Sequence, residues 1–167
     1  TLYDYGEMAS ASVAVGRCDD SVERVVEANT LISGIGFESG GCAAAHAIAV
    51  AYTHINSVHE NYLHGEMVAM GTLAHLVMED NKDAMKAAEF FARVGLPIHL
   101  GQLSMSRERK EDIDIVTDAA MAAGIMHNMP MVVTPDLIRA SILGAHELGE
   151  AVASDIGDKA FCRLQAE

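Results

Sequence analysis

The chain has 167 residues, half of them hydrophobic, with three prolines and no tryptophan. That length and apolar content support a folded core and exclude a disordered chain, while abundant alanine and methionine favour helix over sheet. The formal net charge of −13 and the lack of a basic stripe exclude nucleic acid as a partner.

The cysteines and the hydropathy of the chain indicate the cellular compartment in which we expect the protein. The three cysteines, Cys18, Cys42 and Cys162, form no C-x-x-C pair, and no signal-like segment opens the sequence. Both features are typical of a reducing cytoplasm. No apolar run approaches about 18 residues without polar interruption, so we expect a soluble protein with no membrane partner.

The N-terminal quarter of the chain predicts two helices and a turn. Residues 1–15 can be helical, and Asp19 or Asp20 can cap a second helix whose apolar residues recur at helical spacing as far as Ile32. Four glycines in the nine residues of Ser33–Gly41 favour a tight turn, because glycine disrupts a regular helix.

The rest of the chain predicts further helices. Thr134 followed by Pro135 is a specific start signal, since it places a capping side chain before a proline at the first helical position. The other predicted elements are a short helix from Gly41, capped by Ser39, to about Thr53, a polar break at Asn56–Asn61, and helices from His64 to about Glu79, from Asn81 to Val94, from Ser104 or Ser106 to Gly124, and from Pro135 past His146. We therefore expect an all-α domain of about seven helices.

Two histidines, His46 and His64, are candidate metal ligands. On one unbroken helix they would share a face but lie about 27 Å apart, too far for one ion. The polar Asn56–Asn61 stretch allows the chain to turn back, so both imidazoles can reach one point. Neutral imidazoles are zinc ligands, and His64 would lie at a helix N-terminus. Glu66 either orients an imidazole or, as we prefer, complements the helix dipole.

Two other interpretations of these residues stay open. A lone histidine in an alanine-rich helix more often packs in a core than binds metal. Cys42, four residues before His46, could complete a ligand set with both histidines, although a cysteine among small residues usually packs as a small hydrophobe.

The sequence around the two histidines resembles one enzyme family. The runs Gly36-Phe37-Glu38-Ser39-Gly40-Gly41, Ala43-Ala44-Ala45-His46-Ala47 and His64-Gly65-Glu66-x-Val68-Ala69 resemble the glycerol dehydrogenases of the metal-dependent, iron-containing-type alcohol dehydrogenase family. The likeness runs from about Ser21 through Ile32 to Leu73 and returns at Val94–Pro97, His127–Pro130 and Thr134–Pro135. It implies a fold like the helical C-terminal domain of dehydroquinate-synthase-like and iron-containing alcohol dehydrogenases.

The resemblance also implies roles for individual residues. His46 and His64 would be the catalytic residues that hold the ion, which is usually Zn²⁺ and otherwise Fe²⁺ or another divalent ion. Phe37 and His46 would contact the substrate. The third metal ligand, an aspartate, is expected upstream of Thr1.

For the whole protein, the resemblance implies oxidation of glycerol by NAD to dihydroxyacetone, in a cytoplasmic homo-oligomer. Residues 1–167 would be the C-terminal metal- and substrate-binding domain. NAD would be bound mainly by an N-terminal domain that is not present in this chain, which has no G-x-G-x-x-G after a strand. We therefore expect weak metal binding and little or no dehydrogenase activity from this chain alone.

Two functions of other classes are the alternatives. One is a helical-bundle metal-carboxylate protein, in which Glu60 and His64 would contribute to a two-metal site, although paired Glu-x-x-His motifs are missing. The other is a catalytically silent helical module that serves assembly through exposed apolar area.

Overall fold

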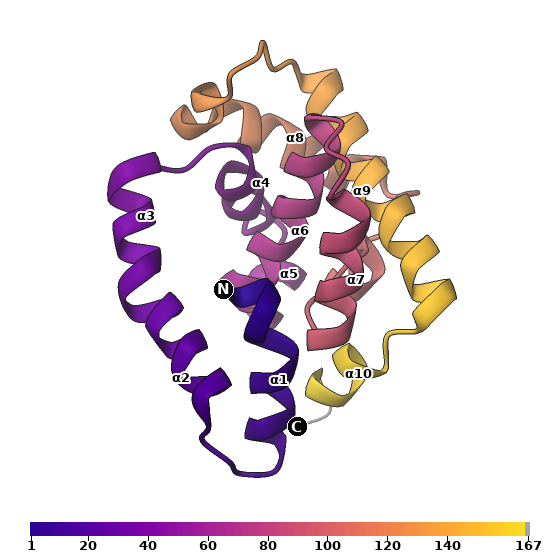
Figure 1. Ribbon diagram of the computed structural model, residues 1–167. Coiled ribbons are helices and arrows are strands. Elements are labelled where there is room, and N and C mark those ends of the chain that lie inside the picture. The colour runs from indigo at the N-terminus through magenta and orange to yellow at the C-terminus, as the bar shows by residue number, and fades with distance from the viewer. Residues whose placement is uncertain (166–167) are drawn as a thin grey trace. The chain divides into compact units, whose positions relative to one another are not determined.

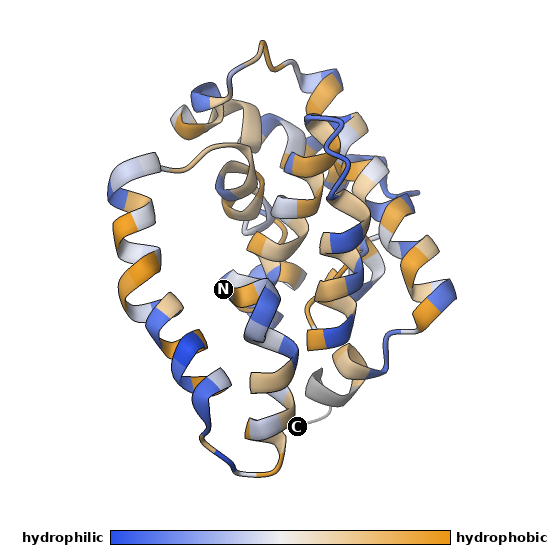
Figure 2. Ribbon diagram, viewed as in Figure 1, coloured by the Kyte–Doolittle hydropathy of each residue, from blue (hydrophilic) through white to orange (hydrophobic). Residues whose placement is uncertain are grey.

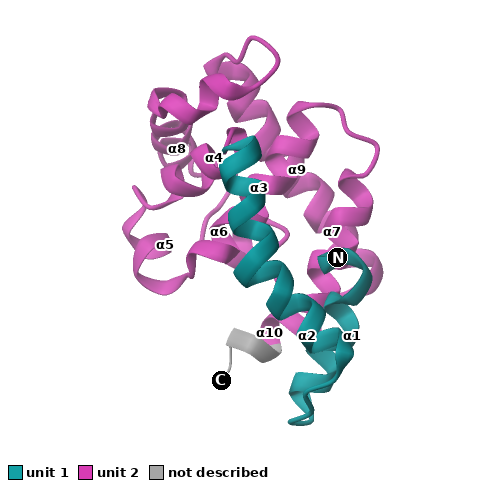
Figure 3. Cartoon of the chain, turned by 60° about the vertical axis from the view of Figure 1, so that its left-hand side comes forward, with its two compact units in different colours: residues 1–41 teal, residues 42–167 magenta. Residues whose placement is uncertain are grey.

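The computed structural model describes the backbone of residues 1–165 and the side chains of residues 1–162. Over this range the chain is helical and has no strand, which confirms the all-α class. It divides into two compact units, Thr1–Gly41 and Cys42–Glu167 (Figure 3). In the part of the chain so described, no helix is both long enough and apolar enough to cross a bilayer.

The first unit opens with α1 (Leu2–Ala14), which packs against α2 (Asp20–Glu27). Asp19 caps α2 as predicted, because its carboxylate accepts the backbone N–H groups of Ser21 and Val22. Beyond α2 the helix continues through a π-helical turn, Ala28–Ile32, into α3 (Ser33–Gly40).

The turn predicted over Ser33–Gly41 is wrong, since the segment is helical as far as Gly40. Each glycine costs a helix about 0.5–1 kcal/mol relative to alanine, which biases the chain against helix without forbidding it. Within this segment φ becomes positive at Gly41, at 69°, and the helix ends there. Ser39 therefore lies inside α3 and does not cap the next helix.

The second unit contains the remaining helices (Figure 1). They are α4 (Ala44–Tyr52), α5 (Asn56–Asn61), α6 (His64–Met78), α7 (Ala84–Val94), the 3₁₀ turn η2 (Leu100–Leu103), α8 (Lys110–Ala122), the 3₁₀ turn η3 (Gly124–Asn128), α9 (Pro135–Ile156) and α10 (Lys159–Gln165). The predicted start at Thr134 is confirmed, because its hydroxyl accepts the Leu137 N–H at 3.2 Å. The predicted end at Val94 is also confirmed, and the residue after it, Gly95, has a φ of 85°.

The polar stretch Asn56–Asn61, predicted as a break, forms a short helix that separates α4 from α6. Val58, fully buried, ties this helix to the core. The side-chain amide of Asn61 donates to the Ser57 carbonyl at 2.8 Å, which closes the helix locally. The break needed between the two histidines is therefore present in helical form.

The core of the second unit lies where α4 packs on α6, with α8 against α4 and α9 against α6. Figure 2 shows both α4 and α6 largely in the hydrophobic colours. Gly71 of α6 lies so close to α4 that an added Cβ would be 2.1 Å from the carbonyl oxygen of Ala45. The two backbones therefore approach closely one residue before His46.

Candidate metal centre

The two predicted ligands come from neighbouring helices. His46 is the third residue of α4, and His64 is the first residue of α6. Their ring centroids lie 5.8 Å apart, and the ring planes are tilted by 45°. The fold thus brings together two imidazoles that are eighteen residues apart in sequence.

This separation suits an ion shared by two imidazoles. A zinc–nitrogen bond is about 2.0–2.1 Å long, so two rings that share an ion have centroids roughly 5 to 6.4 Å apart, depending on the angle at the metal. The observed 5.8 Å falls in that range. Two protein ligands would leave coordination positions for a third ligand and for substrate.

The electrostatics of the pair also suit metal binding. Burial, and then the neighbouring His64 ring, lower the pKa of His46 below its ordinary value. A lowered pKa keeps the ring neutral near pH 7, and the neutral form is the one that coordinates an ion. His46 is partly buried while His64 is exposed, so packing holds one ring and the other faces solvent.

Glu66 secures the start of α6. Its carboxylate accepts the backbone N–H of Leu63 at 2.7 Å, which satisfies a donor that the helix itself leaves unpaired. A negative charge in the first turn also complements the helix dipole. This contact supports the predicted role of Glu66 at the helix start.

The structure also places two other candidate site residues, Phe37 and Cys42. Phe37 lies on α3 of the first unit with 62% of its side chain exposed, and its contact with substrate stays a prediction. Cys42 precedes α4, so it is not one helical turn from His46, and the ligand set with Cys42 loses its geometric basis. Among the described residues, no group of three or more histidine, cysteine, aspartate or glutamate side chains could hold a metal ion. A complete site would need a ligand beyond the pair.

Three structural features were not predicted. The Asn128 side chain donates to the backbone carbonyl of Cys42 at 2.8 Å. Gly71 allows the close approach of α4 and α6, and a glycine inside a helical pattern is the signal that could have indicated it. A second histidine pair, His99 and His146, has ring centroids 6.2 Å apart, and no sequence spacing indicates that contact because packing alone creates it.

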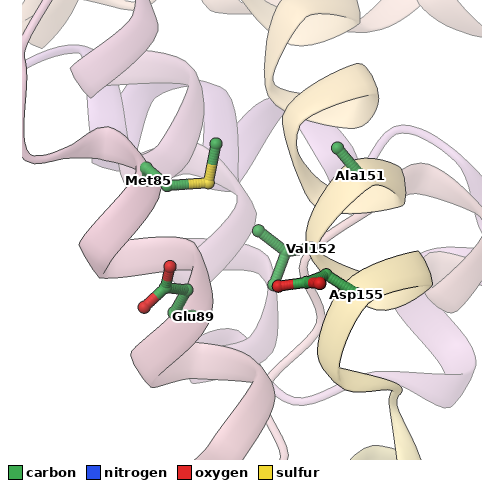
Figure 4. A pocket seen from close by; sticks show the side chains of 5 residues that line it. All are labelled: Met85, Glu89, Ala151, Val152 and Asp155. Atoms are coloured by element: carbon green, nitrogen blue, oxygen red, sulfur yellow. The ribbon is translucent and has the colours of Figure 1, made fainter.

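A small cavity lies between α7 and α9 (Figure 4). Met85 and Glu89 of α7 face Ala151, Val152 and Asp155 of α9. The cavity volume of about 120 Å³ is below the roughly 300–1,000 Å³ typical of ligand pockets. It contains neither histidine of the pair, so it is not the candidate site.

Comparison with known proteins supports the family resemblance. No family model matches the chain. It is 40% identical over 155 residues to the glycolaldehyde reductase of Halobacterium salinarum and 42% identical over 153 residues to the glycerol dehydrogenase of Citrobacter freundii. These matches cover 91% and 90% of the chain but 42% of each relative. The chain therefore spans less than half the length of these curated relatives.

The fold is also shared with a solved structure. The crystal structure of glycerol dehydrogenase from Schizosaccharomyces pombe matches with a TM-score of 0.86 at 38% identity, over 93% of this chain and 41% of that one. In fold and sequence the chain therefore resembles part of a glycerol dehydrogenase. Glycerol dehydrogenases are members of the iron-containing-type alcohol dehydrogenase family.

Proposed function

We propose that this chain supplies two ligands, His46 and His64, to the catalytic Zn²⁺ of an NAD-dependent glycerol dehydrogenase. The observation that carries the proposal is the 5.8 Å approach of two imidazoles in a chain 42% identical to a glycerol dehydrogenase. NAD would be bound mainly by residues outside this chain. The protein would act in the cytoplasm and self-associate.

The residues of this chain would hold and orient the reacting groups. A bound ion would polarise a substrate hydroxyl as a Lewis acid. His46, neutral and packed on α4, would set the position of the site, and His64 would complete the pair from the exposed start of α6. Phe37 would form an apolar wall of the substrate pocket. The cofactor would accept the hydride, so the task of the protein is alignment.

The substrate proposal is glycerol, since several relatives are named glycerol dehydrogenase. One relative is named glycolaldehyde reductase, so glycolaldehyde is the competing substrate. Both molecules carry oxygens on neighbouring carbons. The ratio of kcat/KM for glycerol oxidation and glycolaldehyde reduction, measured with an active enzyme that contains this chain, decides between them.

Zinc titration of the chain tests the proposed ligands. In ¹H–¹⁵N spectra of the histidine rings, the His46 and His64 signals are expected to shift together as Zn²⁺ is added. His46→Ala and His64→Ala should each abolish this binding, whereas His59→Ala, at an exposed position on α5, should preserve it. Binding that survives both site substitutions contradicts the proposed ligand pair.

The activity of the chain alone is a separate test. An NADH absorbance assay with glycerol, Zn²⁺ and NAD is expected to show little or no turnover, because two histidines alone do not make a complete catalytic site. Ordinary turnover from these 167 residues would overturn that expectation.

The same titration separates the alternatives. One zinc ion per chain agrees with the dehydrogenase proposal, two ions favour the metal-carboxylate bundle, and none favours the silent assembly module. Light scattering over a concentration series measures the expected self-association.

A further inference from the structure

Asn128 connects two distant segments of the second unit. It ends η3, and its side-chain amide donates to the carbonyl oxygen of Cys42 at 2.8 Å. The two residues are 86 positions apart in sequence. Cys42 lies two residues before α4 begins and four residues before His46.

The donor is held on both sides by the core. Met126 is fully buried, and Met129 is 6% exposed, so the turn that carries Asn128 has an apolar anchor before and after it. Contacts between η3 and α4 extend this anchoring to the helix that carries His46. The Asn128 amide is therefore a fixed point against which α4 can be placed.

The backbone segment that contains the accepting Cys42 carbonyl has no side-chain cap. Gly41 has a φ of 69°, and Ala43 has φ −141° and ψ −142°, so the backbone that enters α4 is irregular. Ala43 is the residue before the helix, and no side chain caps α4 there. A side-chain hydrogen bond to the Cys42 carbonyl supplies the anchor that a cap would supply elsewhere.

We propose that Asn128 is a positioning residue for the metal centre. By holding the Cys42 carbonyl it fixes the start of α4, and so fixes the orientation of the His46 ring relative to His64. This role rests on the proposed function, in which those two rings hold the ion. Asn128 would act on the site through the backbone of α4 and not as a metal ligand.

The test compares two variants, Asn128→Ala and Asn128→Gln, with a control variant, Asn81→Ala. All three are made in the 167-residue chain. Between α6 and α7 the Asn81 side chain accepts a hydrogen bond from the Asp83 N–H at 3.0 Å. Asn81→Ala therefore also removes a solvent-exposed hydrogen bond made by an asparagine side chain. Asn128→Ala is expected to weaken Zn²⁺ affinity roughly threefold to tenfold, the effect of one neutral hydrogen bond. Asn128→Gln keeps the amide donor and should recover part of the loss, while Asn81→Ala should match the wild type.

Amide hydrogen exchange provides the readout that a general loss of stability would not reproduce. The Ala47 N–H, which donates to the Ala43 carbonyl at 3.1 Å, should exchange faster in Asn128→Ala. The Met67 N–H at the start of α6, which donates to the Leu63 carbonyl at 3.2 Å, should be unchanged. Faster exchange at both amides would mean global destabilisation and would overturn the positioning role.

The two proposals fail in different ways. If the wild-type chain binds no Zn²⁺, the proposed function fails, and the exchange comparison alone decides whether Asn128 fixes the start of α4. If the wild type binds Zn²⁺ and Asn128→Ala matches it in affinity and in exchange, the metal pair stands and the role of Asn128 is refuted.

Discussion

Replacing Gly71 by alanine is expected to push α4 away from α6 and to weaken both the fold and the metal centre. A Cβ at this position would lie 2.1 Å from the Ala45 carbonyl oxygen and 3.3 Å from the Ala49 nitrogen. Ordinary contact begins at 3.4 Å, so the two backbones would have to separate by roughly 1 Å. Ala45 precedes His46, so this movement would carry the His46 ring with it.

The free-energy cost follows from two opposing effects. Overpacking a core costs about 1–3 kcal/mol, and the upper end applies here because a backbone carbonyl cannot rotate away from the new methyl group. Alanine stabilises the helix itself by about 0.5–1 kcal/mol relative to glycine. The net loss of unfolding free energy is therefore about 2 kcal/mol, which corresponds to a fall in Tm of roughly 4–8 °C for a chain of this size.

Thermal unfolding followed by circular dichroism measures this change. Gly65→Ala is the matched control, because Gly65 lies on the same helix with no atom within 4 Å of an added Cβ. Its Tm is expected to stay the same or to rise slightly. A Gly71→Ala chain as stable as the Gly65→Ala chain would refute the close packing of α4 on α6.

Two further predictions concern pH. Burial, followed by the nearby His146, lowers the pKa of His99 below its ordinary 6.5. As the pH falls, His99 therefore takes up a proton in the unfolded chain before it does so in the folded chain. The stability contributed by neutral His99 is complete above about pH 6.5 and falls as the pH drops below that value. His99→Gln should flatten that slope in urea unfolding between pH 7.5 and 5.5, and an unchanged slope would contradict the assignment. Hydrogen bonds from Ser12 and Ser21 lower the pKa of Asp19 from 3.8 to about 2, so its capping of α2 should persist above pH 3.8 and be lost toward pH 2. Amide signals of the first α2 turn in an NMR pH titration check this, and Asp19→Ala should lack the transition.

Local signals in the sequence predicted several helix ends correctly, although the starts expected at Asn81 and at Ser104 or Ser106 were wrong, because α7 begins at Ala84 and α8 at Lys110. The caps at Asp19 and Thr134 and the left-handed glycine at Gly95 each act within a few residues, so their chemistry can be recognised without knowing the fold. The glycine-rich stretch Ser33–Gly41 was misjudged because glycine content is a weak bias, and the chain remained helical until φ became positive at Gly41.

The sequence by itself indicated the helical class through its apolar spacing, and its local motifs carried the family resemblance and the two candidate ligands. The 5.8 Å between His46 and His64, by contrast, was decided only by tertiary structure. Gly71, which has no side chain, allows α4 and α6, the helices that carry the two rings, to approach closely. The link from Asn128 to Cys42 is likewise a product of packing, since no rule of spacing joins residues 86 positions apart. Local chemistry chooses the helices, and the shape of their contacts decides which side chains meet.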